Sequence, residues 1–244
     1  MKISNELKKI AVIPVYNEEL NIKNILGGLE KIVNFFILIN DGSTDRSNEI
    51  IKNWRRMREN VFLIDSKKNR GMSWAVREGL RFIQNNQKEL GIQDNDIVIQ
   101  IDADAQHFCR NIDEMIEYMK TNHIDYLITR RILNGYPFIK IIGNRIMSRF
   151  VSLLTSNNFY DVESGFRLLR VEFIPQLLSC TIGYRYSWAQ EMAIVASKIG
   201  LKVDNAWEVP INYYRKRGTR ISDALINCLL SFIVRFNFHT KKSN

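Results

Sequence analysis

The 244-residue sequence has few cysteines and no long hydrophobic run. Cys109, Cys180 and Cys228 lie far apart and lack the spacing of metal ligands, which excludes a disulfide scaffold and favours a reducing compartment. The longest apolar run near the C-terminus, 224–234, is too short to span a bilayer. The first ten residues lack the apolar core of a signal peptide. We therefore expect a cytoplasmic protein, peripheral at the cytoplasmic face of a membrane.

Two common nucleotide-binding signatures are also missing. The chain contains neither G-x-G-x-x-G at its first strand–helix turn nor a G-x-x-x-x-G-K-[ST] loop. Neither a Rossmann dehydrogenase nor a P-loop enzyme is therefore supported. Internal repeats and low-complexity tracts are absent as well, so the length indicates one globular domain, or one domain with an appendage.

Positive charge is present in excess. Lysine and arginine number 35 against 26 aspartates and glutamates, which gives a formal net charge of +9. Such a balance predicts an anionic partner, which could be nucleotide phosphates, an acidic membrane surface or nucleic acid. No recognised nucleic-acid-binding module occurs in the sequence, so we expect no nucleic-acid partner.

The first half of the chain alternates between two hydrophobic patterns. Short apolar runs occupy 10–16, 35–40, 61–65, 96–102 and 125–129, and helical periodicity occupies 19–33, 45–58, 72–88 and 111–121. This alternation predicts an α/β fold with a mostly parallel sheet flanked by helices, and ligands at the carboxyl ends of the strands. Later segments predict helices over 135–157, 187–199 and 221–238 and an extended stretch over 201–214.

Polar residues gather where three of these runs end. Asn17 and Glu18 follow the first run, Asn40 and Asp41 the second, and Asp102 and Asp104 the fourth. Because the carboxyl ends of parallel strands share one edge of a sheet, we expect the three groups to converge. The convergence predicts a ligand site at that edge.

The segment DADAQH, 102–107, predicts a metal site. Asp102, Asp104 and Gln106 offer oxygen ligands at alternate positions, which suits Mg²⁺ or Mn²⁺ holding a diphosphate. A cation would also relieve the repulsion between the two carboxylates. The alternative interpretation is a solvated turn with incidental acids. His107 is interpreted as an ordinary loop residue.

Five motifs in order resemble those of family-two glycosyltransferases. They are PVYNEE (14–19), NDGSTD (40–45), NRGMSWAVREGL (69–80), DADAQH (102–107) and DVESGFRLLR (161–170). The sequence looks most like the polyprenyl-phosphate (dolichol-phosphate) mannosyl- and glucosyltransferase branch. The resemblance runs from about residue 10 to 222. It implies a GT-A catalytic domain over 1–220, followed by a C-terminal apolar helix and basic tail over 221–244. It also implies inverting transfer from a nucleotide sugar with Mg²⁺ or Mn²⁺.

The resemblance assigns a role to each matching residue. The residues matching the nucleotide-sugar site are Pro14, Tyr16, Asn17, Glu18, Asp41, Asn69, Gly71, Asp102 and Ala103. Asp102, Asp104 and Gln106 match the metal motif. We assign the acceptor phosphate to Ser164, Arg167, Arg215, Arg217 and Arg220, and catalysis to Asp104, Arg167 and Glu191. Asn40 and Glu163 depart from the residues common at their positions, and the basic loop 213–222 has an altered pattern that keeps its positive charge.

Three hypotheses follow. The first is a membrane-surface enzyme that transfers a hexose from a donor of the GDP-mannose or UDP-glucose type to a polyprenyl phosphate, an acceptor that needs no strong base because it is largely ionised. The second is transfer to a saccharide, for which Glu191 would be the base. The third is a nucleotide-sugar-binding protein without catalysis. The helix 135–157 is interpreted either as interfacial or as a core helix with exposed basic residues. A membrane-protein partner and a homo-oligomer both stay open.

Overall fold

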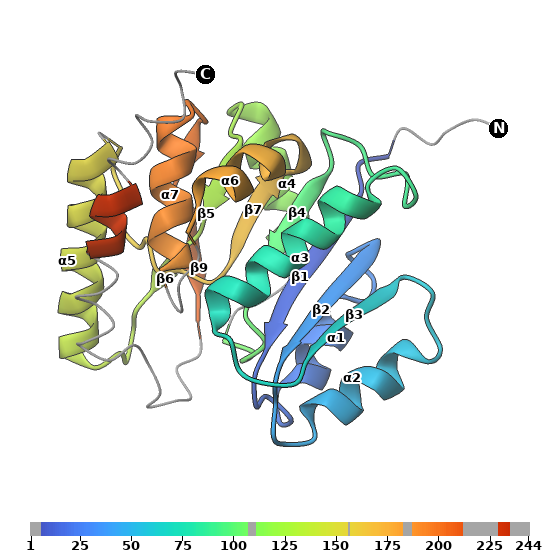
Figure 1. Ribbon diagram of the computed structural model, residues 1–244. Coiled ribbons are helices and arrows are strands. Elements are labelled where there is room, and N and C mark those ends of the chain that lie inside the picture. The colour runs from blue at the N-terminus through green and yellow to red at the C-terminus, as the bar shows by residue number, and fades with distance from the viewer. Residues whose placement is uncertain (1–5, 107–110, 156, 183–186, 212–228, 235–244) are drawn as a thin grey trace.

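A seven-stranded sheet lies at the centre of the computed structural model, which describes residues 6–106, 111–155, 157–182, 187–211 and 229–234 (Figure 1). Its order is β3-β2-β1-β4-β7-β5-β8. The strands are β1 (Lys9–Val15), β2 (Phe35–Asp41), β3 (Val61–Ser66), β4 (Ile97–Gln100), β5 (Tyr126–Ile128), β7 (Arg167–Arg170) and β8 (Val203–Asp204). Two further strands, β6 (Arg130–Ile132) and β9 (Glu208–Pro210), form a separate parallel pair.

Helices cover both faces of the sheet. They are α1 (Ile22–Leu29), α2 (Ser47–Arg55), α3 (Met72–Asn86), α4 (Ile112–Thr121), α5 (Phe138–Thr155), α6 (Ile174–Cys180) and α7 (Trp188–Lys198), with a 3-10 turn η2 (Val171–Phe173) before α6. Buried residues of α3, α6 and α7 belong to one apolar cluster, and those of α1, α2 and α4 belong to a second one. The expected α/β fold, a mostly parallel sheet flanked by helices, is confirmed.

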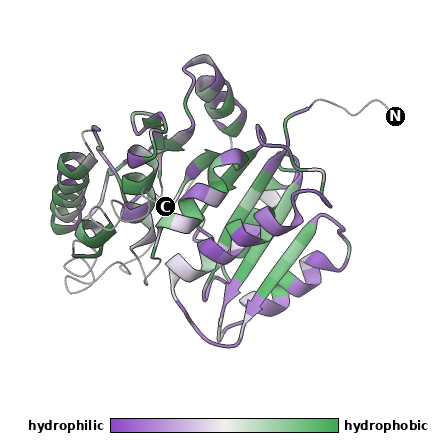
Figure 2. Ribbon diagram, turned by 45° about the horizontal axis from the view of Figure 1, so that its top comes forward, coloured by the Kyte–Doolittle hydropathy of each residue, from purple (hydrophilic) through white to green (hydrophobic). Residues whose placement is uncertain are grey.

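The apolar runs form strands because both of their faces are buried. In β1, Ile10 and Val12 face one cluster, whereas Ala11 and Ile13 face the other, as the two-residue period of a strand requires. Strands buried on both faces carry continuous rather than alternating apolar sequence, which is typical of parallel sheets. Figure 2 shows these central strands as predominantly hydrophobic, with hydrophilic stretches on the helices outside them.

Strand β7 departs from the expected parallel arrangement. It is antiparallel to both of its neighbours, β4 and β5, and Arg167 pairs with Gln100. An antiparallel strand begins at the edge where its neighbours end. The residues that precede β7, 161–166, therefore lie at the same edge as the residues that follow β4, 101–106. This pairing brings the DVESGF motif to the DADAQH motif.

The C-terminal prediction falls largely outside the described residues. Within 221–244 the structure describes only a helical segment at 229–234, so the proposed boundary at residue 220 stays a prediction. Among the described residues, no helix is both long enough and apolar enough to cross a bilayer.

Candidate active site

A cavity of about 190 Å³ lies where β1, β2 and β4 end. Its walls are formed by Pro14, Val15, Tyr16, Glu18, Asp41, Asn69, Gly71, Met72, Ala75, Asp102, Ala103 and Asp104. Most of the residues predicted to bind the donor are therefore together. Val15, Met72 and Ala75 were not predicted. The last two belong to the first turn of α3, directly after the predicted Gly71, and their position at a helix start could have indicated them.

Asp41 fixes the beginning of α3 beside the cavity. Its Oδ1 accepts a hydrogen bond from the backbone N–H of Arg70 at 2.7 Å, and its Oδ2 accepts one from Gly71 at 2.8 Å. The neighbouring Gly42, with φ of +68°, lies so close that a Cβ there would be 2.4 Å from the carbonyl carbon of Lys68. These contacts place the N-terminus of α3 at the cavity wall, where its dipole favours an anion such as a diphosphate.

Asn17 and Glu18, both predicted to bind the nucleotide sugar, connect the loop after β1 to the residues after β2. Asn17 has φ of 55°, and its Oδ1 accepts a hydrogen bond from the Thr44 N–H at 2.8 Å. Asn17 does not line the cavity. The Glu18 N–H donates to Ser47 Oγ at 2.8 Å, and the Glu18 side chain lines the cavity, where Asn21 Nδ2 donates to its Oε2.

The carboxylate of Asp102 lies in the cavity wall with one oxygen that has no hydrogen-bond partner. That oxygen, Oδ1, is buried. Burial raises the pKa of Asp102 to about 7, the charge of Asp104 adds to that rise, and Arg131 and Arg167 oppose it. Its Oδ2 packs on Gly165 so closely that a Cβ at residue 165 would be 1.9 Å away. An unpaired carboxylate oxygen beside a second carboxylate fits a divalent cation.

Two carboxylates make an incomplete metal shell. In the stretches of chain that the structure describes, no three His, Cys, Asp or Glu side chains are grouped to hold a metal. Asp102 and Asp104 alone would leave coordination positions for diphosphate oxygens and water, the arrangement that Mg²⁺ commonly adopts. Asp102 and Asp104 therefore fit a cation that is coordinated by the protein and by the diphosphate of a nucleotide sugar.

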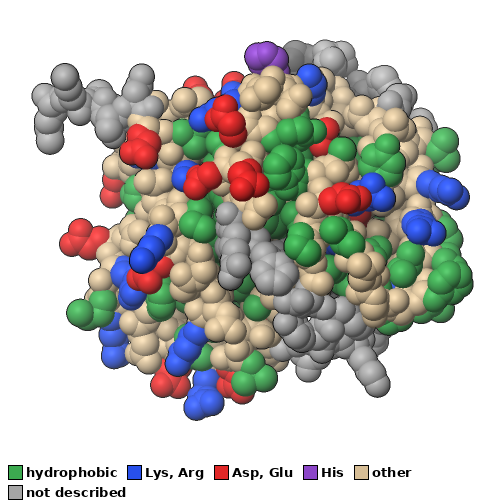
Figure 3. Space-filling view, turned by 180° about the vertical axis from the view of Figure 1, so that it is seen from behind, with side chains coloured by type: hydrophobic (Ala, Val, Ile, Leu, Met, Phe, Trp, Pro, Cys, Tyr) green, Lys and Arg blue, Asp and Glu red, His purple; other side chains and the backbone are tan. Residues whose placement is uncertain are grey.

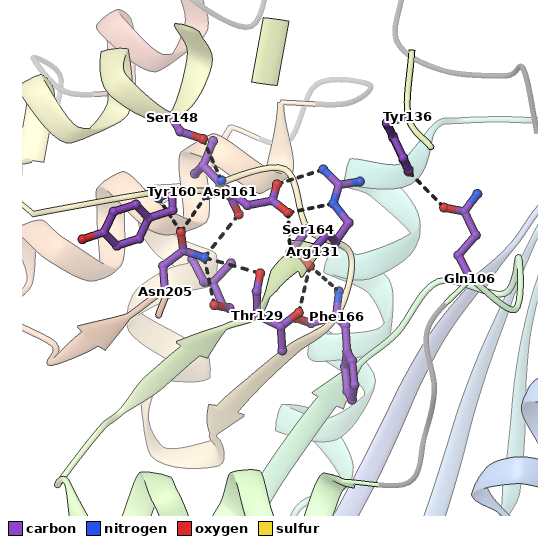
Figure 4. A network of polar contacts seen from close by, with 12 residues as sticks. Gln106, Thr129, Arg131, Tyr136, Ser148, Tyr160, Asp161, Ser164, Phe166 and Asn205 are labelled. Atoms are coloured by element: carbon purple, nitrogen blue, oxygen red, sulfur yellow. Dashed lines mark hydrogen bonds and ion pairs between the residues drawn. The ribbon is translucent and has the colours of Figure 1, made fainter. Parts of the chain in front are cut away.

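Gln106, the third predicted ligand, lies beside the cavity rather than in its wall. Its N–H donates to Asp104 Oδ1 at 3.1 Å, and its Oε1 accepts a hydrogen bond from the Tyr136 hydroxyl at 3.1 Å (Figure 4). The role of Gln106 as a ligand stays a prediction. Its contact with Tyr136 joins the metal motif to the segment before α5.

A buried ion pair behind the DADAQH segment was not predicted from the sequence. The Nε and Nη2 atoms of Arg131 donate to the two oxygens of Asp161, each at 2.8 Å (Figure 4). Burial by itself raises the pKa of Asp161, but the charge and hydrogen bonds of Arg131 outweigh burial and lower it. Burial likewise favours a lower pKa for Arg131, and Asp161 reverses that direction. Two consecutive arginines, Arg130 and Arg131, follow the apolar run 125–129, and this pair of charges is the signal that could have indicated Arg131.

Ser164 and Arg167 were predicted at the acceptor phosphate, but their side chains form hydrogen bonds within the protein. Ser164 Oγ shares a hydrogen bond with Thr129 Oγ1 at 2.9 Å. Arg167 is 1% exposed, and its guanidinium donates to the carbonyls of Val162, Ser164 and Ala189 and to the Tyr126 hydroxyl. Neither side chain lines the cavity. These hydrogen bonds hold the 161–166 segment in place, and the role of Ser164 and Arg167 in acceptor binding or catalysis stays a prediction.

Glu191, predicted as a catalytic residue, is fully buried near the start of α7. Its Oε2 accepts a hydrogen bond from the Ile182 N–H at 2.6 Å, and its Oε1 accepts one from the Ser187 hydroxyl. It does not line the cavity, so the geometry provides no support for a base at this position. Arg215, Arg217 and Arg220, predicted at the acceptor phosphate, lie outside the described residues.

The chain is similar to known proteins of one family. The family described as Glycosyl transferase family 2 matches residues 10–178. An uncharacterised protein of Methanocaldococcus jannaschii is 28% identical, over 94% of this chain and 99% of its own. The UDP-N-acetylglucosamine–dolichyl-phosphate N-acetylglucosaminyltransferase of Methanococcus voltae is 30% identical, over 86% of this chain and 89% of its own.

A solved structure shares the fold. Glucosyl-3-phosphoglycerate synthase from Mycobacterium tuberculosis, in complex with Mn²⁺, uridine diphosphate and phosphoglyceric acid, superposes with a TM-score of 0.65. The alignment covers 95% of this chain and 78% of that chain at 13% identity. The GT-A fold expected from the five sequence motifs is thereby confirmed.

Proposed function

Because the chain belongs to glycosyl transferase family 2, and is therefore a glycosyltransferase, we propose that it transfers a hexose from a nucleotide-diphosphate sugar to a polyprenyl phosphate, with inversion at the anomeric carbon. The reaction would take place at the cytoplasmic face of a membrane. The observation that carries this proposal is the meeting of Asp102, Asp104 and the start of α3 at one cavity.

The donor half of the proposal rests on the cavity wall. Asp41, Asn69 and Gly71 line the side formed by β2 and α3, and the N-terminus of α3 offers a positive end to a diphosphate. Asp102 and Asp104 would hold Mg²⁺ or Mn²⁺. Such a cation, when bound, neutralises negative charge on the diphosphate that departs from the sugar. The donor class is a nucleoside diphosphate hexose of the GDP-mannose or UDP-glucose type.

The acceptor half rests on the relative from Methanococcus voltae, which is named for a dolichyl-phosphate acceptor, and on the basic character of the chain. A phosphate acceptor is largely ionised near neutral pH and needs no strong base. This agrees with Glu191, whose two carboxylate oxygens accept hydrogen bonds from Ile182 and Ser187 away from the cavity. Transfer to a saccharide hydroxyl would require a base, and Glu191, the residue predicted for that role, does not line the cavity.

The proposed reaction depends mainly on the relative position of the donor and the acceptor. One oxygen of the acceptor phosphate attacks the anomeric carbon from the side opposite the nucleotide. A new carbon–oxygen bond forms as the bond to the diphosphate breaks, and the diphosphate keeps the electron pair. The rigid loop ends set by Asp41 and by Arg167 would align donor and acceptor, and alignment of this kind supplies a large share of enzymatic rate acceleration.

Transfer of label from donor to lipid tests the proposal. The purified protein is incubated with a short polyprenyl phosphate in detergent, Mn²⁺, and radiolabelled UDP-N-acetylglucosamine, UDP-glucose or GDP-mannose in turn. We expect label from one donor to enter an organic phase and to be released by mild acid. Asp104→Ala should lower the rate by at least about 100-fold, whereas Glu117→Ala, at an exposed acid of α4, should not change it. Label confined to a water-soluble saccharide, or full transfer by Asp104→Ala, would contradict the proposal.

A further inference from the structure

Helix α5 (Phe138–Thr155) presents a large apolar face to solvent. The exposed apolar side chains are Phe138 (75%), Ile139 (71%), Ile142 (38%), Ile146 (62%) and Leu153 (84%). Phe138 and Ile139 are adjacent, and the later members follow at intervals of three, four and seven residues, so at about 100° per residue all five lie on one side of the helix. Figure 2 shows α5, at the left edge, as mostly hydrophobic, and Figure 3 shows green side chains with blue ones among them along the corresponding edge. We call these five residues the outer face of α5.

The outer face is not the face that α5 needs for folding. Asn144, Met147, Ser148 and Val151 are the buried residues of α5, and they form a separate row on the opposite side. The helix packs in that direction against α7. Scattered exposed apolar residues are normal, but a contiguous row of five large ones on a single helix indicates a binding surface.

Charge on α5 identifies the kind of surface it would bind. The helix carries Lys140, Arg145 and Arg149 and no aspartate or glutamate. Arg145 and Arg149 are exposed and lie, by helical spacing, along one border of the outer face. A helix that combines apolar residues with basic residues at the border suits the headgroup region of an anionic membrane.

A second copy of the chain is a poorer occupant. In a two-fold symmetric dimer the same patch meets itself, so the Arg145 and Arg149 side chains of two copies would be brought together. No acid on α5 is present to pair with them. Like charges that meet across an interface disfavour association.

We propose that α5 lies in the plane of an anionic membrane surface, with its outer face inserted among the lipids and Arg145 and Arg149 on lipid phosphates. This inference rests on the proposed function only in placing the acceptor in the membrane. It assigns the membrane contact to a particular helix of the catalytic domain.

α5 and the segment just before it are hydrogen-bonded to the two loops that border Asp102. Ser148 Oγ accepts a hydrogen bond from the Val162 N–H at 3.0 Å, which ties the helix to the 161–166 segment (Figure 4). Tyr136, two residues before the helix, donates to Gln106 of the metal motif. A membrane-bound α5 would thus hold the cavity near the surface that delivers a lipid phosphate.

Vesicle flotation tests the proposal with the full-length protein. The vesicles are phosphatidylcholine, with or without about one-third phosphatidylglycerol. We expect the wild type to float with the anionic vesicles, and the Ile146→Glu/Leu153→Glu variant to bind at least tenfold more weakly. Arg145→Gln and Arg149→Gln should each weaken binding about fivefold. Leu20→Glu and Met57→Glu are matched controls, because Leu20 (77%) and Met57 (85%) are exposed elsewhere, and they should bind like the wild type.

The outcomes separate this proposal from the proposed function. Transfer to a short, water-soluble prenyl phosphate and stabilisation by nucleotide with Mn²⁺ should be unchanged in the Ile146→Glu/Leu153→Glu variant, which also shows that it folds. Loss of vesicle binding in that variant supports the membrane contact even if no sugar transfer is detected. Equal vesicle binding by the variant and the wild type would overturn it. So would a wild-type dimer, measured by analytical ultracentrifugation, that becomes monomeric in the variant.

Discussion

Gly165 and Asp102 are in direct contact although 63 positions separate them in the chain. The backbone at residue 165 lies against the Asp102 carboxylate, which has one oxygen without a partner and shares the cavity with Asp104. At the scale of single residues, the site therefore depends on the absence of a side chain as much as on the presence of two acids. Asp41 is comparable, because its two oxygens fix the Arg70 and Gly71 amides beside the same cavity.

Adding a methyl group at Gly165 should disturb catalysis more than folding. In Gly165→Ala the new Cβ would be 1.9 Å from Asp102 Oδ2, so the carboxylate or the loop must move. We expect kcat/KM for sugar transfer to fall about 100-fold, because a shift of about 1 Å can cost that much, while Tm changes by only a few degrees. Gly27→Ala is the control, since nothing lies within 4 Å of a Cβ there. Full activity in Gly165→Ala would show that the close packing is unimportant.

At the scale of elements, β7 and the segment before it decide how the second half of the chain reaches the site. β7 inserts between β4 and β5, and the Arg131–Asp161 pair ties the start of that segment to β6. The same segment is bonded to α5 through Ser148. Strand, ion pair and helix thus hold the 161–166 segment from three sides.

Removing the Asp161 charge should destabilise the protein in a pH-dependent way. Asp161→Asn leaves Arg131 without its buried counter-charge, and we expect a loss of about 3–5 kcal/mol in the free energy of unfolding at pH 7. The folded state lowers the pKa of Asp161, so its stabilising contribution is complete above the unfolded value near 3.8 and is lost as pH falls through the folded value. Urea unfolding of both proteins between pH 2.5 and 7 measures this.

The comparison protein for that measurement is Asp113→Asn. Asp113 pairs with Lys9 at the surface and its side chain is 72% exposed, so we expect a loss of no more than about 1 kcal/mol. A pH-independent gap between wild type and Asp161→Asn would show that the Asp161 contribution is not electrostatic.

At the scale of the whole molecule, a ligand bound in the cavity should raise global stability. The cavity walls come from residues between Pro14 and Asp104, at the ends of β1, β2 and β4, which pair directly in the sheet, and at the start of α3, so unfolding would abolish the cavity. A ligand that binds only the folded state raises the free energy of unfolding by about 2.7 kcal/mol at a concentration 100 times its Kd.

Thermal unfolding with nucleotides and metal tests this coupling. We expect uridine or guanosine diphosphate to raise Tm in the presence of Mn²⁺ and to raise it much less after chelation with EDTA. Asp102→Asn and Asp104→Asn should lose the Mn²⁺-dependent part of the shift, because each removes a charged oxygen ligand. Glu117→Gln, an exposed acid on α4, should keep it. A shift that is equal with Mn²⁺ and with EDTA would contradict a shared cation.

The sequence by itself determined the parallel part of the sheet and most of the cavity wall. Apolar runs and helical periodicity are local signals, and a parallel sheet brings the carboxyl ends of its strands to one edge whatever the loops do. Asp41, Asp102 and Asp104 were predictable for this reason, and the family motifs added Asn69 and Gly71.

Only the tertiary structure decided the surroundings of the residues predicted beyond the cavity wall. Arg167 and Glu191 carry charges that the motifs mark for function, yet folding buries both and satisfies them with backbone and side-chain partners. The pairing of Arg131 with Asp161 and the contact of Gly165 with Asp102 join residues 30 and 63 positions apart. Such contacts leave no periodic trace in the sequence, because they depend on where β7 inserts and not on the residues beside each partner.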